Sequence, residues 1–165
     1  MKNPIVALVY DFDGTLSPGN MQEFGFIQAI GKTPEEFWAL SDRIAIGGDA
    51  SNVLAYMKMM MDEAKRCGIP LKKESFKDFG KNIELFEGVK EWFGLIRKYG
   101  EKKGVRIEHY INSSGLKELV EGSPIADEFK HVFAGSFIYD EDGNAVWPGI
   151  AVDYTTKTQF LFKIS

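Results

Sequence analysis

Six residues near the start of the chain, Ile5 to Tyr10 (IVALVY), form a continuous apolar run rich in β-branched side chains. Such a run predicts a strand buried on both faces, and strands of that kind are typical of parallel sheets covered by helices. The run leads directly into two carboxylates, Asp11 and Asp13. The chain is therefore expected to be built around a parallel sheet, with an acidic pair at the end of its first strand.

The pattern after this strand divides the chain into two parts. Residues 21 to 85 are predicted to be almost entirely helical, with Thr33 as an N-cap before Pro34 and Gly68 as a helix stop. From residue 86 onward the pattern alternates between helix and strand, with a hairpin turn at residues 142–144. This order predicts an α/β fold with a parallel sheet, and a second, helical lobe inside the first crossover.

Composition excludes several classes of protein. The length of 165 residues fits one domain, or a compact domain with an insertion, and a hydrophobic content of 44% is enough for a core. The formal net charge is −4 and the basic residues are scattered, so no nucleic-acid partner is expected. The single cysteine, Cys67, excludes an internal disulfide and suits a reducing compartment. The apolar start is too short to span a bilayer, so we expect a cytoplasmic protein with no membrane partner.

Asp11 and Asp13 are two residues apart on an extended segment, so their side chains leave on the same side. That position, at the carboxyl end of a strand, is where open α/β sheets bind ligands. Two carboxylates so close together repel each other unless a cation separates them, and Mg²⁺ is commonly held by one or two carboxylates together with a substrate phosphate. A carboxylate can also attack phosphorus, while a second one protonates the leaving oxygen and later activates water. The pair is thus a candidate site for phosphoryl transfer.

Residues 11–17, DFDGTLS, resemble motif I of the haloacid dehalogenase-like (HAD) hydrolases, whose usual form is DxDGT[L/T]. The alternative is a strand that ends in a solvated Asp-Gly turn, but the six-residue pattern after an apolar strand favours the resemblance. The resemblance implies a Rossmann-like α/β core. It also implies that Asp11 is the nucleophile and a Mg²⁺ ligand, and that Asp13 is the general acid/base with its backbone carbonyl on the metal.

Two further positions fit the pattern of this family. By resemblance, Ser113 in EHYINSSG would hydrogen-bond the transferring phosphoryl group, and Ser114 and Gly115 would offer backbone N–H groups at a helix start. Lys157, just after a Thr-Thr cap, would neutralise the phosphate and the nucleophile. Without the resemblance, these residues would be read as an ordinary capping serine and a solvated lysine.

The resemblance also divides the chain into domains. Residues 1–17 and 86–165 would form a discontinuous HAD-like core, and residues 18–85 a helical C1-type cap, as in the phosphoserine-phosphatase-like branch. Such caps close over the site, exclude water and select the substrate. Candidates for contact with the leaving group, for each of which a surface or packing role is favoured, are Asn20, Met21, Glu23 and Arg43.

One part of the family's pattern has no counterpart in this sequence. The fourth motif, an acidic pair on a strand after the lysine helix, is not present before the sequence stops at Ser165. We therefore expect a truncated chain, a parallel sheet that is incomplete on its C-terminal side, and weakened Mg²⁺ binding. The first strand would then lie at an open edge, which predicts self-association into a homo-oligomer through that edge.

The leading functional hypothesis is a phosphatase that hydrolyses a small phosphorylated metabolite, with Mg²⁺ and an aspartyl-phosphate intermediate. A second hypothesis is a non-catalytic module that keeps the phosphate pocket, or self-associates, without turnover. A third is another HAD chemistry, such as dehalogenation or phosphomutase transfer. Dehalogenases of this family need neither the second aspartate nor the metal, so Asp13 favours the phosphatase.

Overall fold

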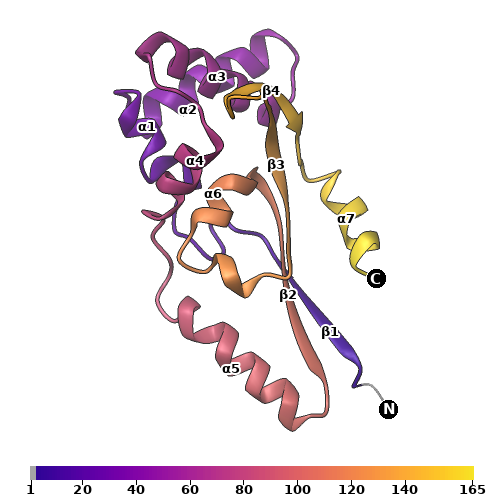
Figure 1. Cartoon of the computed structure of the whole chain (residues 1–165). Coiled ribbons are helices and arrows are strands. Elements are labelled where there is room, and N and C mark those ends of the chain that lie inside the picture. Colours follow the sequence, from indigo (N-terminus) through magenta and orange to yellow (C-terminus); the bar gives the residue numbers. More distant parts are fainter. Residues whose placement is uncertain (1–2) are drawn as a thin grey trace.

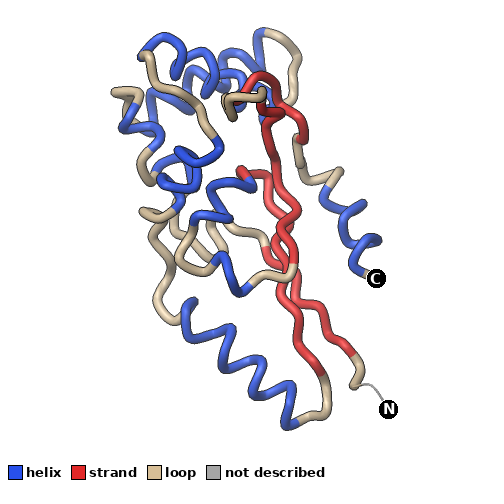
Figure 2. Tube along the Cα trace, in the orientation of Figure 1, coloured by secondary structure: helices blue, strands red, loops and turns tan. Residues whose placement is uncertain are grey.

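A computed structural model describes residues 3–165 of the chain (Figure 1). Over these residues the strands form one sheet in the order β1-β2-β3-β4 (Figure 2). Strands β1 (Ile5–Tyr10), β2 (Arg106–Leu116) and β3 (His131–Tyr139) run parallel, and β4 (Ala145–Ile150) pairs antiparallel with β3. The α/β class and the mainly parallel sheet are as predicted from the sequence.

Helices fill the connections between the strands. The connection from β1 to β2 contains a 3₁₀ helix, η1, and helices α1 to α5, whereas α6 and a second 3₁₀ helix, η2, precede β3, and α7 follows β4. Their bounds are η1 Met21–Glu23, α1 Phe26–Ala29, α2 Pro34–Gly47, α3 Asn52–Cys67, α4 Lys73–Gly80, α5 Val89–Lys102, α6 Lys117–Gly122, η2 Ala126–Glu128 and α7 Lys157–Ile164. Within residues 3–165, no helix has both the length and the apolar character needed to cross a bilayer.

Helices α1 to α4 gather at one end of the molecule, where the β3–β4 hairpin also lies (Figure 1). Helix α2 begins as predicted, because the Thr33 hydroxyl accepts a hydrogen bond from the Glu36 N–H and the Glu36 carboxylate accepts one from the Thr33 N–H. Helix α3 ends at Gly68, which has the left-handed φ of 68°. The Ala145 N–H at the start of β4 donates to the Leu71 carbonyl at 2.8 Å. The helical segment is therefore tied to the hairpin by backbone hydrogen bonding.

The helical segment also meets the core where α4 packs against α6. A Cβ added to Gly80 would lie 2.3 Å from the Leu119 carbonyl oxygen, and one added to Gly122 would lie 2.1 Å from the Lys77 carbonyl oxygen. Because these positions are occupied by backbone atoms, the two helices touch backbone to backbone and leave no room for a side chain. Gly80 is the last residue of α4.

Strand β1 is not buried on both faces, contrary to the expectation from its composition. Ile5 is 51% exposed and Val6 is 40% exposed. Within the described residues β1 pairs only with β2, so it forms an edge of the sheet, as expected from the missing fourth motif. An apolar run specifies the side chains of a strand but not its neighbours, and the pattern therefore could not distinguish a central strand from this edge strand.

An aromatic cluster packs α5 against β2. His109 is 2% exposed and lies edge-to-face with the Phe93 ring, with 5.0 Å between the ring centroids. The Trp92 indole N–H donates to the Tyr10 hydroxyl, which lies 2.9 Å from His109 Nδ1. The other ring nitrogen, Nε2, is buried without a hydrogen-bond partner among the described residues. Burial lowers the pKa of His109, so the folded protein favours the neutral ring.

Acid should therefore weaken the fold through His109. The unfolded chain binds this proton near its ordinary pKa of about 6.5 and the folded protein only at lower pH, so the stabilisation is complete above that value and is lost as the pH falls below it. Between about pH 6.5 and pH 5, we expect the free energy of unfolding to fall more steeply in the unsubstituted protein than in His109→Gln, by up to about 1.4 kcal/mol per pH unit. Urea denaturation at a series of pH values measures this difference. The other histidine, His131, is common to both proteins, so parallel pH profiles would contradict the prediction.

Candidate active site

The loop after β1 sets the directions of the two aspartates. The Phe12 carbonyl accepts hydrogen bonds from the backbone N–H groups of residues 15–17, and Gly14 adopts a left-handed φ of 70°. The Phe12 side chain is fully buried in the core. Because successive side chains of an extended segment point to opposite sides, the burial of Phe12 directs Asp11 and Asp13 together to the other side.

Asp11 contacts a lysine that is distant in the sequence. Its Oδ2 accepts a hydrogen bond from the Lys157 ammonium at 2.5 Å, and its Oδ1 accepts one from the Phe12 N–H at 2.8 Å. Lys157 is the first residue of α7 and is separated from Asp11 by 146 positions. The Asp11 side chain remains 45% exposed. The structure thus brings together two residues that the sequence placed in one site, and leaves the carboxylate accessible to a ligand.

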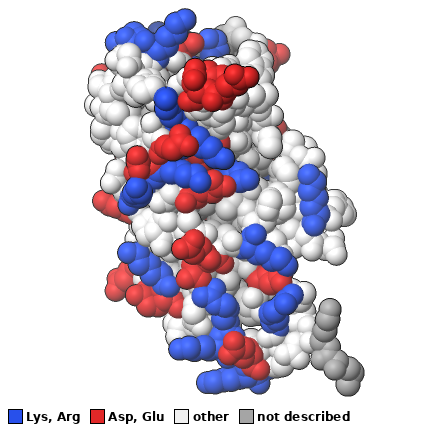
Figure 3. All heavy atoms as spheres, viewed as in Figure 1, with Lys and Arg blue, Asp and Glu red and all other residues white. Residues whose placement is uncertain are grey.

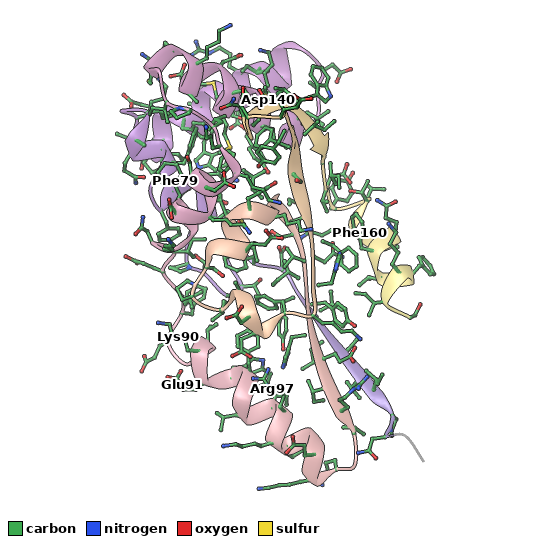
Figure 4. All side chains as sticks on the ribbon, in the orientation of Figure 1. Phe79, Lys90, Glu91, Arg97, Asp140 and Phe160 are labelled. Carbon is green, nitrogen blue, oxygen red and sulfur yellow. The ribbon has the colours of Figure 1, made fainter. Side chains whose placement is uncertain are left out.

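A small set of contacts holds α7 and its lysine in place. The Asn112 side-chain amide donates to the Lys157 carbonyl at 2.8 Å, and Phe160 points toward the sheet and stacks on a phenylalanine of β3 with 4.9 Å between centroids (Figure 4). Thr156 is the N-cap residue of α7, as predicted, but its side chain makes no capping bond to the helix. Instead, the Asp153 carboxylate accepts a hydrogen bond from the Thr156 N–H at 2.7 Å. The Thr156 hydroxyl itself accepts a hydrogen bond from the Asp153 N–H at 2.7 Å, so it bonds to the preceding turn rather than to the helix.

Asp13 is more enclosed than Asp11. Its Oδ1 accepts a hydrogen bond from the Met21 N–H at 3.0 Å, and a Cβ on Gly115 would lie 3.2 Å from its Oδ2. Burial raises the pKa of Asp13 to about 7, and the charge of Asp11 adds to this effect, whereas the Met21 N–H opposes it. A carboxyl group with this pKa can both release and take up a proton near neutral pH.

The serine segment differs from the predicted turn and helix start. Strand β2 continues through Ser113 and Ser114 to Leu116, with an irregularity in its pairing with β3, and α6 begins only at Lys117. Ser113 is fully buried, and its Oγ accepts a hydrogen bond from the Gly115 N–H at 3.0 Å. That N–H is therefore already bonded, contrary to the expectation that it would be offered to a phosphate. The Ser113 hydroxyl keeps its own proton, which it can donate.

Comparisons with known proteins show which proteins resemble this chain in sequence and structure. No family model matches the chain. An uncharacterized protein of Borreliella burgdorferi is 28% identical over 185 aligned positions, which cover 98% of this chain and 65% of that protein. Among solved structures, a HAD family hydrolase of Salmonella enterica serovar Typhi matches with a TM-score of 0.69 and 13% identity, over 98% of this chain and 52% of that one. A phosphoserine phosphohydrolase-like protein of Francisella tularensis matches with a TM-score of 0.63 and 23% identity, over 100% and 74% of the two chains.

A substrate-bound phosphoserine phosphatase likewise matches with a TM-score of 0.63 and 18% identity, over 99% of this chain and 70% of that one. The chain has the fold of the HAD-like hydrolases. It spans 65% of the length of the Borreliella relative and about half of the Salmonella hydrolase.

In this HAD-like fold the acidic pair is the candidate magnesium site. Carboxylate oxygens are the ligands that Mg²⁺ prefers, and one or two of them suffice when substrate phosphate and water complete the shell. One oxygen of Asp11 and one of Asp13 accept a backbone N–H, which fixes both carboxylates without occupying all of their lone pairs. Across residues 3–165, no group of three or more His, Cys, Asp or Glu side chains is placed to hold a metal. The residues present fit a Mg²⁺ site formed by the Asp11 carboxylate and the Asp13 backbone carbonyl, and the contribution of a further acidic motif stays a prediction.

A cavity of about 210 Å³ opens beside Asp13 and Ser114. Its other walls come from the loop after β1 and from η1, α2 and α3; the last three contribute Gln22, Trp38 and Tyr56 among others. The Tyr56 hydroxyl donates to the Ser114 carbonyl at 2.8 Å and so ties α3 to the end of β2. A larger cavity of about 660 Å³ lies at the opposite, amino-terminal end of β1, away from both aspartates.

Sequence reasoning found only part of this cavity. Of the four candidates for contact with a leaving group, Asn20 lines the cavity, whereas Met21 is buried and Arg43 is exposed elsewhere on α2. The fourth, Glu23, accepts hydrogen bonds from the Asn20 and Trp38 side chains. The sequence did not single out Gln22, Trp38 or Tyr56, and their only signal was their place within the segment expected to cover the site.

Proposed function

We propose that the protein is a Mg²⁺-dependent phosphomonoester hydrolase that acts on a small phosphorylated metabolite through an aspartyl-phosphate. The observation that carries this proposal is the contact of 2.5 Å between Asp11, at the carboxyl end of β1, and the Lys157 ammonium. A carboxylate can approach an anionic phosphate only when their mutual repulsion is offset, and the ammonium supplies positive charge at that point. The HAD-like fold and the phosphatases among its structural matches support the same reaction class.

The proposed reaction has two steps. First, an Asp11 carboxylate oxygen attacks phosphorus and the bond to the ester oxygen breaks, while Asp13 gives its proton to the departing oxygen. Asp13 then takes a proton from water, the water oxygen attacks phosphorus, and the bond from phosphorus to Asp11 breaks to release phosphate. We assign the Ser113 hydroxyl and Ser114 to the phosphoryl oxygens, and Lys157 to the neutralisation of their charge. Mg²⁺, when bound by Asp11 and Asp13, adds positive charge next to the phosphate.

We assign residues 18–85 to a cap, and residues 1–17 and 86–165 to the core, with residues 1 and 2 outside the described part. The gathering of α1 to α4 at one end of the molecule supports this division, as does the cavity between α2, α3 and Asp13 (Figure 1). On the face shown in Figure 3, basic and acidic side chains are interspersed, which supports a small-molecule partner over a nucleic acid. We place the activity in the cytoplasm because the single cysteine suits a reducing compartment.

The proposal predicts hydrolysis that depends on Mg²⁺. The protein should release nitrophenolate from p-nitrophenyl phosphate in the presence of Mg²⁺, and EDTA should lower the rate by about 10²-fold or more because the charge next to the phosphate is lost. Excess Mg²⁺ should restore the rate, which absorbance spectroscopy follows directly. Turnover that is unchanged by EDTA would rule out the metal dependence.

A non-catalytic module is the second candidate, and the open edge of β1 favours it. Ile5 and Val6 are exposed there, and such an edge can pair with the same strand of a second copy. Binding of inorganic phosphate without turnover, under the conditions of the assay above, would favour this candidate over the phosphatase. Self-association through β1 stays a prediction.

A further inference from the structure

The cavity beside Asp13 is placed to receive the part of a substrate that leaves the phosphate. It holds about 210 Å³, the volume of roughly seven water molecules, which is enough for a group of a few heavy atoms. Asp13 and Ser114 form one wall, and Asp13 is the residue assigned to protonate the departing oxygen. A phosphate held at Asp11 and Lys157 would therefore direct its ester group toward this cavity.

Two aromatic rings meet at a corner of the cavity. The Trp38 and Tyr56 ring centroids are 6.0 Å apart, and their planes differ by 74°. The polar edges of both rings are already bonded, because the Trp38 indole N–H donates to Glu23 Oε1 at 2.7 Å and the Tyr56 hydroxyl donates to the Ser114 carbonyl at 2.8 Å. The rings are thus held in fixed orientations, and a ligand beside them meets aromatic side chains rather than free hydrogen-bond donors. The faces of tryptophan and tyrosine attract cations.

The polar groups that line the cavity favour a ligand that carries a positively charged hydrogen-bond donor. Gln22 is 1% exposed and lines the cavity, and its Oε1 has no hydrogen-bond partner among residues 3–165. A buried amide oxygen without a partner costs free energy, which a donor on a ligand would recover. Asp42 adds a carboxylate to the lining, and none of the described lysines or arginines lines the cavity. A carboxylate on a ligand would therefore find no counter-charge there.

We propose that the cavity binds a small alcohol that carries an amino or alkylammonium group, so that the substrate is the phosphate ester of an amino alcohol without a carboxylate. This proposal rests on the proposed function for the phosphate half of the substrate. The ammonium group lies against Trp38 and Tyr56, and Asp42 provides a negative charge in the lining of the same cavity. A neutral polyol gains no cation–π attraction from the rings, and an amino acid ester brings a carboxylate toward Asp42.

The kinetic test compares kcat/KM for phosphoethanolamine, phosphocholine, glycerol 2-phosphate and O-phosphoserine. We expect one or both ammonium esters without a carboxylate to exceed the other two by about tenfold or more. In Trp38→Leu this preference should vanish, because leucine keeps apolar volume but has no π-face. The control Trp147→Leu changes an exposed tryptophan on β4 and should preserve the preference. Equal or faster hydrolysis of O-phosphoserine or glycerol 2-phosphate, or an equal loss for every ester in Trp38→Leu, would overturn the proposal.

A binding measurement separates this proposal from the proposed function. Choline and ethanolamine are titrated calorimetrically into the unsubstituted protein, Trp38→Leu and Trp147→Leu. Binding that is lost only in Trp38→Leu supports the cavity assignment even when no ester is hydrolysed, in which case the proposed function alone fails. A protein that hydrolyses phosphate esters but binds neither amine would overturn the cavity assignment alone.

Discussion

Asp11→Asn should abolish phosphatase turnover, with kcat lowered by about 10³-fold or more, because an amide cannot attack phosphorus to form the covalent intermediate. The substitution keeps the size of the side chain and leaves an amide oxygen to accept hydrogen bonds. The loss of the ion pair to Lys157 should change the free energy of unfolding by no more than about 1 kcal/mol, since the Asp11 carboxylate is 45% exposed. Steady-state kinetics and urea denaturation together therefore separate a chemical loss from a structural one.

The matched control is Asp142→Asn, the same chemical change in the exposed turn between β3 and β4. It should leave kcat unchanged. Rapid acid quench of the unsubstituted protein with ³²P-labelled substrate should trap an acid-stable, hydroxylamine-sensitive label that Asp11→Asn lacks. Turnover in Asp11→Asn at a tenth of the original rate or more would exclude Asp11 as the nucleophile.

Gly122→Ala should destabilise the protein by about 3 kcal/mol, the upper part of the usual range for overpacking. The added Cβ would lie 2.1 Å from the Lys77 carbonyl oxygen and 2.7 Å from the Lys77 carbonyl carbon. These are backbone atoms, so no side-chain rotation relieves the clash, and α4 must move away from α6. Because that contact joins the helical segment to the core, we expect the midpoint of urea denaturation to shift markedly.

Gly47→Ala provides the control for this effect. Gly47 is the last residue of α2, and nothing lies within 4 Å of a Cβ built on it. Alanine there should be neutral or stabilising by about 0.5 kcal/mol, because it restricts the unfolded chain and favours the helix. Equal stability of Gly122→Ala and Gly47→Ala would show that α4 and α6 can separate without cost.

The sequence predicted those features of the fold that depend on residues close together in the chain. The capping of α2 by Thr33 and the left-handed end of α3 at Gly68 follow from residues adjacent in sequence. The exposure of Ile5 and Val6 does not follow from neighbouring residues, because it depends on which strands lie beside β1. The Thr156 side chain makes no capping bond to α7, because its hydroxyl instead accepts a hydrogen bond from the Asp153 N–H.

In the candidate site, too, features set by nearby residues were predicted, whereas features set by tertiary packing were not. The motif placed Asp11 and Asp13 correctly at the end of β1, and the structure brings Lys157 to Asp11, although the roles of these residues stay predictions. The state of the Gly115 N–H could not be predicted, because it depends on how far β2 continues before α6 begins. Trp38 and Tyr56 were missed because each is an ordinary apolar position of its own helix. Only the packing of α2 beside α3 turns them toward one cavity.

The contact between Asp11 and Lys157 also determines when the site comes into existence during folding. The contact closes a loop of 146 residues. Contacts between such distant positions form late, because closing the loop costs chain entropy before the contact contributes any stabilisation. Early folding species with β1 and β2 paired would hold the acidic pair without its ammonium partner. Partly folded molecules are therefore expected to lack a complete phosphate site, and the arrival of α7 is the step that completes it.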